Sequence, residues 1–253
     1  MSVEWAELKA AELRELAAQG AVVVVPVASI EQHGPHLPVM TDSLLCGTVA
    51  RRGAERAVAE APGGRPVVVA PTVWSGLSEH HMPFGGTLSL DFATFSALIG
   101  EVCRSLQRHG FGRILLLNGH GGNEAALHVI VEQLTPTSEA VLATVNYWHL
   151  AALEFAEILE RQSGVRHACE AETSMVLALR PELVDPARFA EASFEESGPA
   201  GAAYRWRSFA DRTASGVLGD PTAASAEKGE RLLEAAAAAL AALLRNETFW
   251  QGG

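Results

Sequence analysis

Residues 21–42 read AVVVVPVASIEQHGPHLPVMTD, and this stretch decides the fold. The nearly all-apolar run Val22–Val27 has the pattern of a parallel strand that is buried on both faces. Polar residues follow it directly, with Glu31, His33 and Asp42 inside a span of twelve residues. A strand fixes the origin of the loop behind it, and such loops carry ligands. The stretch therefore predicts a strand that delivers two carboxylates and an imidazole to a metal site at the edge of a sheet.

Apolar runs alternate with longer stretches of helical spacing along most of the chain. This βαβαβαβα order predicts the crossover connections that parallel strands need. We expect a three-layer α/β/α sandwich with a mainly parallel central sheet, formed by a single domain over residues 1–253. The expected strands are 22–27, 67–70, 114–117 and 141–145, and the expected helices are 1–20, 43–60, 92–108, 124–134, 148–161, 170–179 and 226–245. The Gly/Ser-rich stretch 193–225 is expected to be a long functional or interface loop.

Composition limits the possible partners and the compartment. The chain has 19 basic and 30 acidic residues, and its net charge of −11 opposes binding to a phosphate backbone, so we expect no nucleic-acid partner. The longest apolar stretch, 235–244, is shorter than the roughly 20 residues of a membrane span. No signal peptide is recognised, and Cys46, Cys103 and Cys169 form no Cys-x-x-Cys pair. We therefore expect a soluble cytoplasmic protein without disulfides or a thiolate zinc site.

Further polar clusters follow the other expected strands. The segment 118–123 reads NGHGGN, and residues 78–81 and 148–149 are also polar or aromatic. Because the carboxyl ends of parallel strands lie at one edge of a sheet, we expect these loops to converge. Imidazole nitrogens and carboxylate oxygens together suit zinc, manganese or iron. The candidate ligands in these loops are Glu31, His33, Asp42 and His120.

A pair of metal ions would use these residue types well. A carboxylate can bridge two cations, and we expect Asp42 to be the bridge. Two ions can make a water more acidic and polarise a substrate carbonyl, whereas a departing nitrogen also needs a proton donor. A third polar cluster, His167–Ser174, offers candidates for that donor and for another metal ligand.

In these motifs the chain resembles the creatininase family, the creatinine amidohydrolase-like metal hydrolases. The resemblance implies a three-layer α/β/α fold, a dinuclear metal site and a homohexamer. It also implies Glu31, His33, Asp42 and His120 as metal ligands, with His167 as the histidine that handles a proton. The matching motifs, which cover roughly residues 20–230, are SIEQHGPHLP at 29–38 with Asp42, EH at 79–80 with GT at 86–87, NGHGGN at 118–123, His167 with ETS at 172–174, and GVLGDP at 216–221.

Two departures from the family pattern affect the substrate. Creatinine-hydrolysing members have a ligand glutamate two residues after the histidine that matches His120, where this chain has Gly122. Glu172 is our candidate to replace that ligand. Those members also have two pocket tryptophans, of which Trp148 matches the first, while residues 162–164 read QSG near the place of the second. Related proteins with the same glycine-rich pattern act on formamidopyrimidine intermediates or trim a precursor peptide, so the family fixes the chemistry better than the substrate.

The main hypothesis is a metal-dependent amidohydrolase that uses metal-activated water to cleave a C–N bond in a small amide, cyclic amide or formamide. We expect two divalent ions, zinc with zinc, manganese or iron. His167 and Glu172 are the candidate catalytic residues, and Trp148 and His80 are the candidate substrate contacts. For His36 we expect a structural role in the turn at residues 35–38.

Three alternatives remain open at this point. The first is a precursor-peptide-trimming peptidase of the same family. The second is a thiol hydrolase that uses Cys169 with His167, which would tolerate a chelator and fail on alkylation. The third is a noncatalytic metabolite-binding protein, which would show ligand-dependent stabilisation without turnover. For Glu170 and Glu172, pairing with the helix N-terminus is the competing structural explanation.

Overall fold

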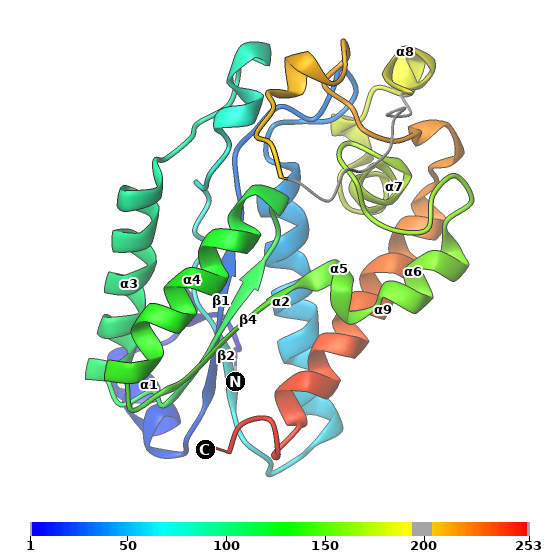
Figure 1. Cartoon of the computed structure of the whole chain (residues 1–253). Helices are drawn as coiled ribbons and strands as arrows, with labels where there is room; N and C mark the ends of the chain where they lie inside the picture. Colours follow the sequence, from blue (N-terminus) through cyan, green and yellow to red (C-terminus); the bar gives the residue numbers. More distant parts are fainter. Residues whose placement is uncertain (1, 194–203, 252–253) are drawn as a thin grey trace.

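The central sheet has four parallel strands in the order β2-β1-β3-β4 (Figure 1). The computed structural model describes residues 2–193 and 204–251. Each expected strand is confirmed to within one residue at either end. The strands are β1 (Val22–Val27), β2 (Val67–Val69), β3 (Arg113–Asn118) and β4 (Val141–Asn146).

Helices connect the strands and continue the chain beyond β4. The α-helices are α1 (Ala10–Ala18), α2 (Thr41–Glu60), α3 (Phe92–Arg108), α4 (Glu124–Leu134), α5 (Tyr147–Leu150), α6 (Ala152–Ile158), α7 (Glu170–Leu179), α8 (Phe189–Ala192) and α9 (Ala226–Arg245). The 3-10 turns are η1 (Trp5–Glu7), η2 (Glu79–Phe84), η3 (Gly121–Asn123), η4 (Thr135–Thr137), η5 (Pro181–Leu183), η6 (Pro186–Arg188), η7 (Phe209–Asp211) and η8 (Pro221–Ala223).

Two expected helices differ from the structure. The helix expected over residues 1–20 is shorter, because a capping box between Lys9 and Glu12 starts α1 only at Ala10. The helix expected over residues 148–161 is divided into α5 and α6 by Ala151, whose φ of −121° and ψ of 34° are not helical. Ala151 is buried, and α6 after the break places Phe155 in the apolar core that it shares with α9.

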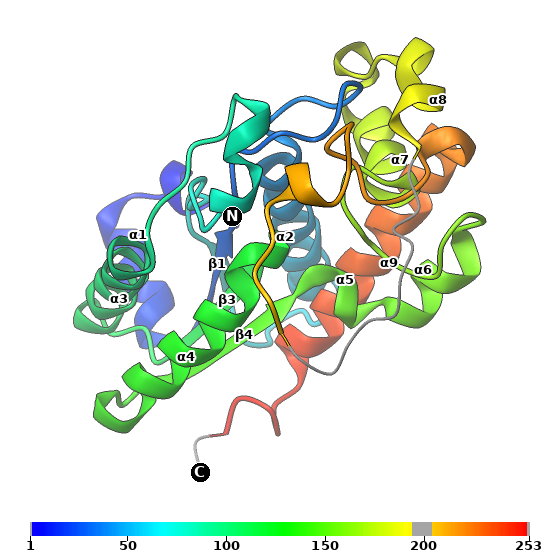
Figure 2. The same ribbon diagram turned by 45° about the horizontal axis from the view of Figure 1, so that its top comes forward.

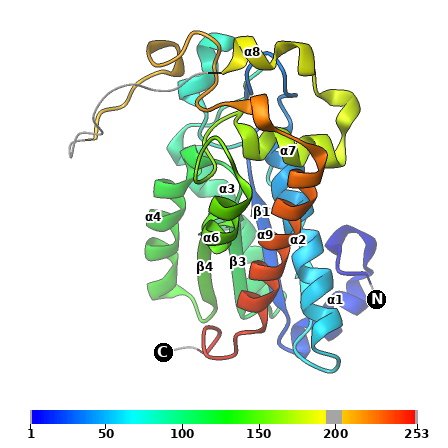
Figure 3. The ribbon, with the colours of Figure 1, turned by 90° about the vertical axis from the view of Figure 1, so that its right-hand side faces the viewer.

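Alternating side chains of β1 enter two separate apolar cores. Val22 and Val24 belong to the core shared with α2, α7 and α9, whereas Val23 and Val25 belong to the core shared with α1, α3 and α4. Because both faces of the sheet are covered, its strands can be apolar throughout, as residues 22–27 are. Figures 1 and 3 show the resulting three layers, which confirm the expected α/β/α sandwich.

The expected long loop 193–225 has more local structure than its composition indicates. Residues 194–203 lie outside the described residues. The remainder contains η7 and η8, and Leu218 exchanges two backbone hydrogen bonds with His167 at 3.0 and 3.1 Å. This pairing holds the end of the segment beside the third polar cluster. An interface role for the segment stays a prediction.

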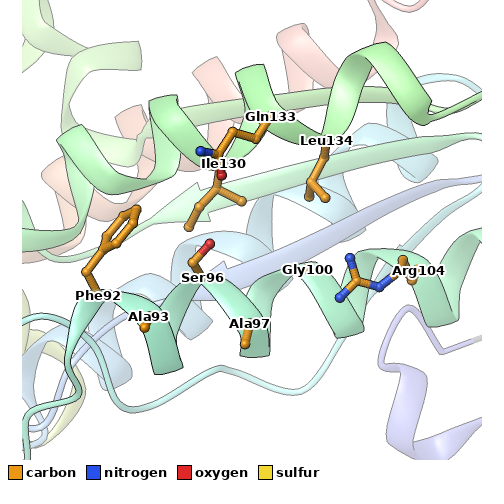
Figure 4. A pocket seen from close by; sticks show the side chains of 9 residues that line it. All are labelled: Phe92, Ala93, Ser96, Ala97, Gly100, Arg104, Ile130, Gln133 and Leu134. Carbon is orange, nitrogen blue, oxygen red and sulfur yellow. The ribbon is translucent and has the colours of Figure 1, made fainter.

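A groove of about 380 Å³ lies between α3 and α4 on the outer side of the helical layer (Figure 4). It is hollow because α3 presents the small residues Ala93, Ser96, Ala97 and Gly100 opposite Ile130 of α4. The groove is lined by helix faces and not by the loops at the strand ends. Within residues 2–193 and 204–251, no helix is long and apolar enough to cross a membrane.

Candidate metal centre

The expected ligands meet where the strands of the sheet end. Glu31 and His33 follow β1, Asp42 lies in the first turn of α2, and His120 follows β3. In Figures 1 and 2 the segments behind β1 and β2, the start of α7 and the segment near residue 210 gather at this end of the molecule. Glu172, in the first turn of α7, joins the group. All five side chains are buried.

The carboxylate of Asp42 lies between two histidines. Its Oδ1 is 3.0 Å from His33 Nε2, and its Oδ2 is 3.1 Å from His120 Nδ1. Glu31 Oε2 is also 3.1 Å from His120 Nδ1. Glu172 Oε1 is 3.9 Å from His33 Nε2. The carboxylates thus form two groups, one around each histidine, and Asp42 belongs to both.

Hydrogen bonds to the main chain orient the two histidine rings. His33 Nδ1 lies 3.1 Å from the carbonyl oxygen of Glu31, and His120 Nε2 lies 3.1 Å from that of Leu77. A carbonyl can only accept, so these two nitrogens carry the protons. In the neutral rings the opposite nitrogens, His33 Nε2 and His120 Nδ1, present lone pairs to the carboxylates, which is the usual arrangement of metal-binding histidines.

Two buried polar atoms in this group have no hydrogen-bond partner. They are His33 Nε2 and Asp42 Oδ2, even though each lies close to another polar atom of the cluster. Buried polar groups are normally paired, because an unpaired one costs about 1–3 kcal/mol. A lone pair beside an unpaired carboxylate oxygen is what a divalent cation would satisfy. The residues present therefore fit a metal site.

The electrostatics of the cluster also favour a cation. Burial disfavours the charged form of His33, but Asp42, Glu172 and Glu31 outweigh burial and raise its pKa to about 10. Burial raises the pKa of Glu172 to about 7, with the neighbouring Asp42 carboxylate adding to the shift. Burial would also raise the pKa of Asp42, but His33 and His120 lower it to about 2. The buried carboxylates attract positive charge strongly, whether it is carried by protons or by metal ions.

The start of α7 holds Glu172 in place through a strained residue. Ala168 has a φ of 52°, a left-handed conformation that is uncommon outside glycine, and its N–H donates to Glu172 Oε2 at 2.5 Å. Glu172 Oε1 remains directed toward His33. His167, the residue before Ala168, lies with its ring centroid 4.4 Å from that of His33. The strained turn therefore brings His167 and Glu172, two residues of the third polar cluster, to the candidate metal centre.

Gly122 leaves no room for a side chain. A Cβ atom there would lie 2.4 Å from His120 Nε2 and 2.4 Å from the carbonyl oxygen of Leu77. The atoms that orient His120 thus occupy the space that a ligand side chain would need. Glu172 approaches the cluster from α7, and its role as a substitute ligand stays a prediction.

The two proposed substrate contacts lie in different surroundings. His80 is half-buried at the edge of the cluster, where its ring stacks on that of His120 with centroids 5.7 Å apart. Trp148 is half-buried in α5 and packs against Tyr147 and the apolar core on the α9 side. These contacts pack part of the Trp148 ring, and a substrate contact of Trp148 stays a prediction.

The surroundings of His36 and Cys169 bear on two sequence interpretations. His36 Nε2 lies 2.9 Å from Thr173 Oγ1, which ties the turn at residues 35–38 to α7 and agrees with the structural role expected for His36. Cys169 is fully buried, and burial raises the pKa of its thiol to about 12. A nucleophilic cysteine needs a low pKa and access to substrate, so the structure argues against the thiol hydrolase.

Sequence reasoning assigned no role to Gln32 and weighed His81 only as a subunit or substrate contact, yet both are buried members of the site. His81 Nε2 lies 3.2 Å from Glu31 Oε1, and Gln32 Nε2 lies 2.7 Å from His81 Nδ1. Their only signal in the sequence was position, since Gln32 stands between two candidate ligands and His81 follows β2 in a polar loop. Phe209 covers both His81 and His167, with ring centroids 4.0 and 4.9 Å apart.

A family model confirms the resemblance of the motifs. The model described as "Creatininase: Creatinine amidohydrolase" matches residues 6–244. The chain belongs to the creatininase family. The match includes all the motifs that surround the candidate metal centre.

Known relatives of this creatininase-family chain have more than one activity in their names. It is 34% identical to "Mycofactocin precursor peptide peptidase" of Mycolicibacterium smegmatis, with 87% of this chain and 82% of the relative covered. It is 31% identical to "Creatinine amidohydrolase" of Pseudomonas putida, with 96% and 94% covered. A solved structure of a mutant creatininase of the Zn-Zn type has a TM-score of 0.80 and 29% identity, covering 98% of each chain.

Proposed function

We propose that this chain is a metal-dependent amidohydrolase that cleaves a C–N bond, in an amide, cyclic amide or formamide, at a site for two divalent ions. The position of Asp42 carries the proposal, because its two oxygens face different histidine nitrogens at 3.0 and 3.1 Å. One ion would be held by Glu31, Asp42 and His120. The other would be held by His33, Asp42 and Glu172.

Two divalent ions supply a more acidic water and polarisation of the substrate carbonyl. His167 is our candidate for the residue that would move a proton in that chemistry. Its Nδ1 lies 3.5 Å from Glu31 Oε1, at the inner side of the cluster. Burial, followed by the nearby His33, holds the pKa of His167 well below its usual range. The imidazole therefore starts neutral, can accept a proton at Nδ1 and can pass it to the departing nitrogen.

The ligand set supports zinc in at least one site and zinc, manganese or iron in the other, since all three accept imidazole and carboxylate. A similar structure of the Zn-Zn type is in line with this choice.

We also propose a homohexamer, by analogy with the family, and a cytoplasmic location. The latter is supported by three buried cysteines, none of which forms a disulfide.

A second candidate activity is the trimming of a precursor peptide. The crowded surroundings of Gly122 favour it, because they exclude a ligand glutamate at the place where creatinine-hydrolysing members have one. The 34% identity to a precursor peptide peptidase points the same way. Both activities break a C–N bond and could use the proposed metal centre. The residues that line the substrate pocket around that centre would decide between them.

Metal analysis combined with a turnover panel tests the proposal. We expect about two divalent ions per chain, and loss of turnover on chelation that returns when zinc or manganese is added. The panel contains creatinine, N-formyl compounds, cyclic amides and short peptides, of which creatinine should be a poor substrate. Turnover that survives chelation but fails on alkylation would instead support the thiol hydrolase. Ligand-dependent stabilisation without turnover would support a binding protein.

A further inference from the structure

The side-chain amide of Gln32 has a fixed orientation within the site. Gln32 is buried, and it stands between Glu31 and His33 in the sequence. Its Oε1 lies 2.9 Å from the N–H of Gly34, and its Nε2 lies 2.9 Å from the carbonyl oxygen of Gly216. A main-chain N–H can only donate and a carbonyl can only accept. The oxygen and nitrogen of the amide can therefore be told apart from their partners.

This orientation determines which nitrogen of His81 carries a proton. The amide nitrogen of Gln32 has two protons, and one of them goes to Gly216. The nearest acceptor for the other is His81 Nδ1, at 2.7 Å. A neutral imidazole that accepts at Nδ1 has its proton on Nε2, which lies 3.2 Å from Glu31 Oε1. His81 thus donates to Glu31 and has no lone pair directed at the centre.

The main chain of Gln32 has the opposite effect on His167. The ring nitrogen His167 Nε2 lies 2.9 Å from the carbonyl oxygen of Gln32 and 3.1 Å from its amide nitrogen. Since both amide protons already have closer acceptors, Nε2 carries a proton and donates to the carbonyl. His167 Nδ1 then faces Glu31 with a free lone pair. One residue therefore makes His81 a donor and His167 an acceptor toward the centre.

We propose that Gln32 is a positioning residue that sets the protons of His81 and His167 and thereby excludes His81 from the metal ligands. The proposal deepens the proposed function and rests on it. By spacing alone, Glu31, His81 and His167 could hold an ion, because their ligand atoms lie within 4.8 Å of one another. The hydrogen bonds of Gln32 remove His81 from that group, which then keeps only Glu31 and His167.

Nitrogen-15 spectra of histidine-labelled protein test the proposal directly, and magic-angle spinning makes them independent of particle size. His81, assigned by the signals that disappear in His81→Gln, should show a neutral ring with its proton on Nε2. That signature should be present without metal and remain after zinc is added, while His33 and His120 change. A proton on His81 Nδ1, or a zinc-induced shift of His81 Nε2, would overturn the proposal.

Substitution of Gln32 provides a second test. In Gln32→Glu a carboxylate replaces the amide donor, so His81 should move its proton to Nδ1 and expose Nε2. Gln162→Glu is the matched control, because Gln162 bonds only Gly164 and Asp220 in the described structure. An unchanged His81 signature in folded Gln32→Glu would contradict the proposal. In His81→Gln, zinc affinity should fall by about 10–100-fold with two ions retained, whereas loss of an ion would make His81 a ligand.

These outcomes are separable from the failure of the proposed function. Protein that binds no zinc would refute the metal-dependent hydrolase, and the metal-free spectrum of His81 would still report the effect of Gln32. Conversely, protein that binds two zinc ions with His81 Nε2 as a ligand would keep the hydrolase and refute the role of Gln32.

Discussion

Two buried glutamates in the first turn of α7 have opposite surroundings. Glu170 accepts from Lys228 Nζ at 2.7 Å and from the N–H groups of Glu160 and Arg161 at 3.0 and 2.8 Å. Glu172, two residues further along, accepts a single N–H from Ala168 and otherwise faces His33 and the carboxylate of Asp42. The first glutamate has the permanent charge of a lysine beside it, whereas the second shares the imidazole of His33 with the carboxylate of Asp42.

The different surroundings of Glu170 and Glu172 distinguish a carboxylate that stabilises the fold from one that is available to a ligand. A buried carboxylate is tolerated when a cation and hydrogen bonds compensate for lost hydration. Lys228 of α9 meets that need for Glu170, and the pair ties α7 to α9 and to the loop after α6. Glu172 has no such lysine, and burial raises its pKa to about 7. A metal ion is the cation that would complete its surroundings, so the two glutamates should respond differently to substitution.

The largest effect is expected at Asp42. Asp42→Ala removes a ligand from both proposed ions, so metal analysis should find nearly complete loss of metal and turnover should disappear. His33→Ala and His120→Ala each weaken one ion and should retain part of the metal. Circular dichroism controls for folding. A folded Asp42→Ala protein with full metal occupancy would refute the bridging role of Asp42 and remove the contrast with Glu170.

His167 should affect the rate and not the metal. His167→Asn removes the proton-handling imidazole that lies beside the candidate metal ligands. General acid–base catalysis contributes about 10²–10⁴-fold to the rate of the chemical step. We expect kcat to fall within that range, with both ions retained and KM little changed. Substrates with better leaving groups need less protonation and should lose less rate. Equal losses for good and poor leaving groups, or loss of metal, would assign His167 a ligand or structural role.

Lys228 tests the structural side of the comparison. Lys228→Met leaves Glu170 buried without its cation, and breaking such a pair costs about 3–5 kcal/mol. The midpoint of urea unfolding should fall accordingly, while metal content per folded chain stays the same. Lys9→Met is the matched control, because the Lys9 side chain is 83% exposed and should change stability little. Loss of metal without loss of stability would mean that the pair serves the site.

The smallest effect is expected at Glu172. Glu172→Gln keeps the volume and removes the charge, so affinity for one of the two ions should fall while the other is retained. We expect a decrease of about 10–100-fold, measured by competition with a chelator. In metal-free protein the change should lower the urea midpoint less than Lys228→Met does, because burial raises the pKa of Glu172 to about 7 and leaves its carboxyl partly neutral. Unchanged affinity for both ions would return Glu172 to a role at the helix end.

The sequence by itself determined the layered fold and most of the candidate ligands. Its apolar run at residues 22–27 has the pattern of a strand covered on both faces, and its helical spacing placed α3, α4, α7 and α9 at their observed bounds. The motifs then gave Glu31, His33, Asp42 and His120, because parallel strands bring their carboxyl ends to one edge. Local pattern and chain order were sufficient for these features.

Only the tertiary structure decided which polar residues face which. Gln32 and His81 are ordinary loop residues in the sequence, and their pairing joins segments that are 49 residues apart. Likewise, nothing near Glu170 in the sequence indicates Lys228, 58 residues away, and nothing near Glu172 indicates that it faces His33 at 3.9 Å. A carboxylate or imidazole takes its role from the charges and hydrogen bonds around it once water is excluded, and folding alone sets those neighbours.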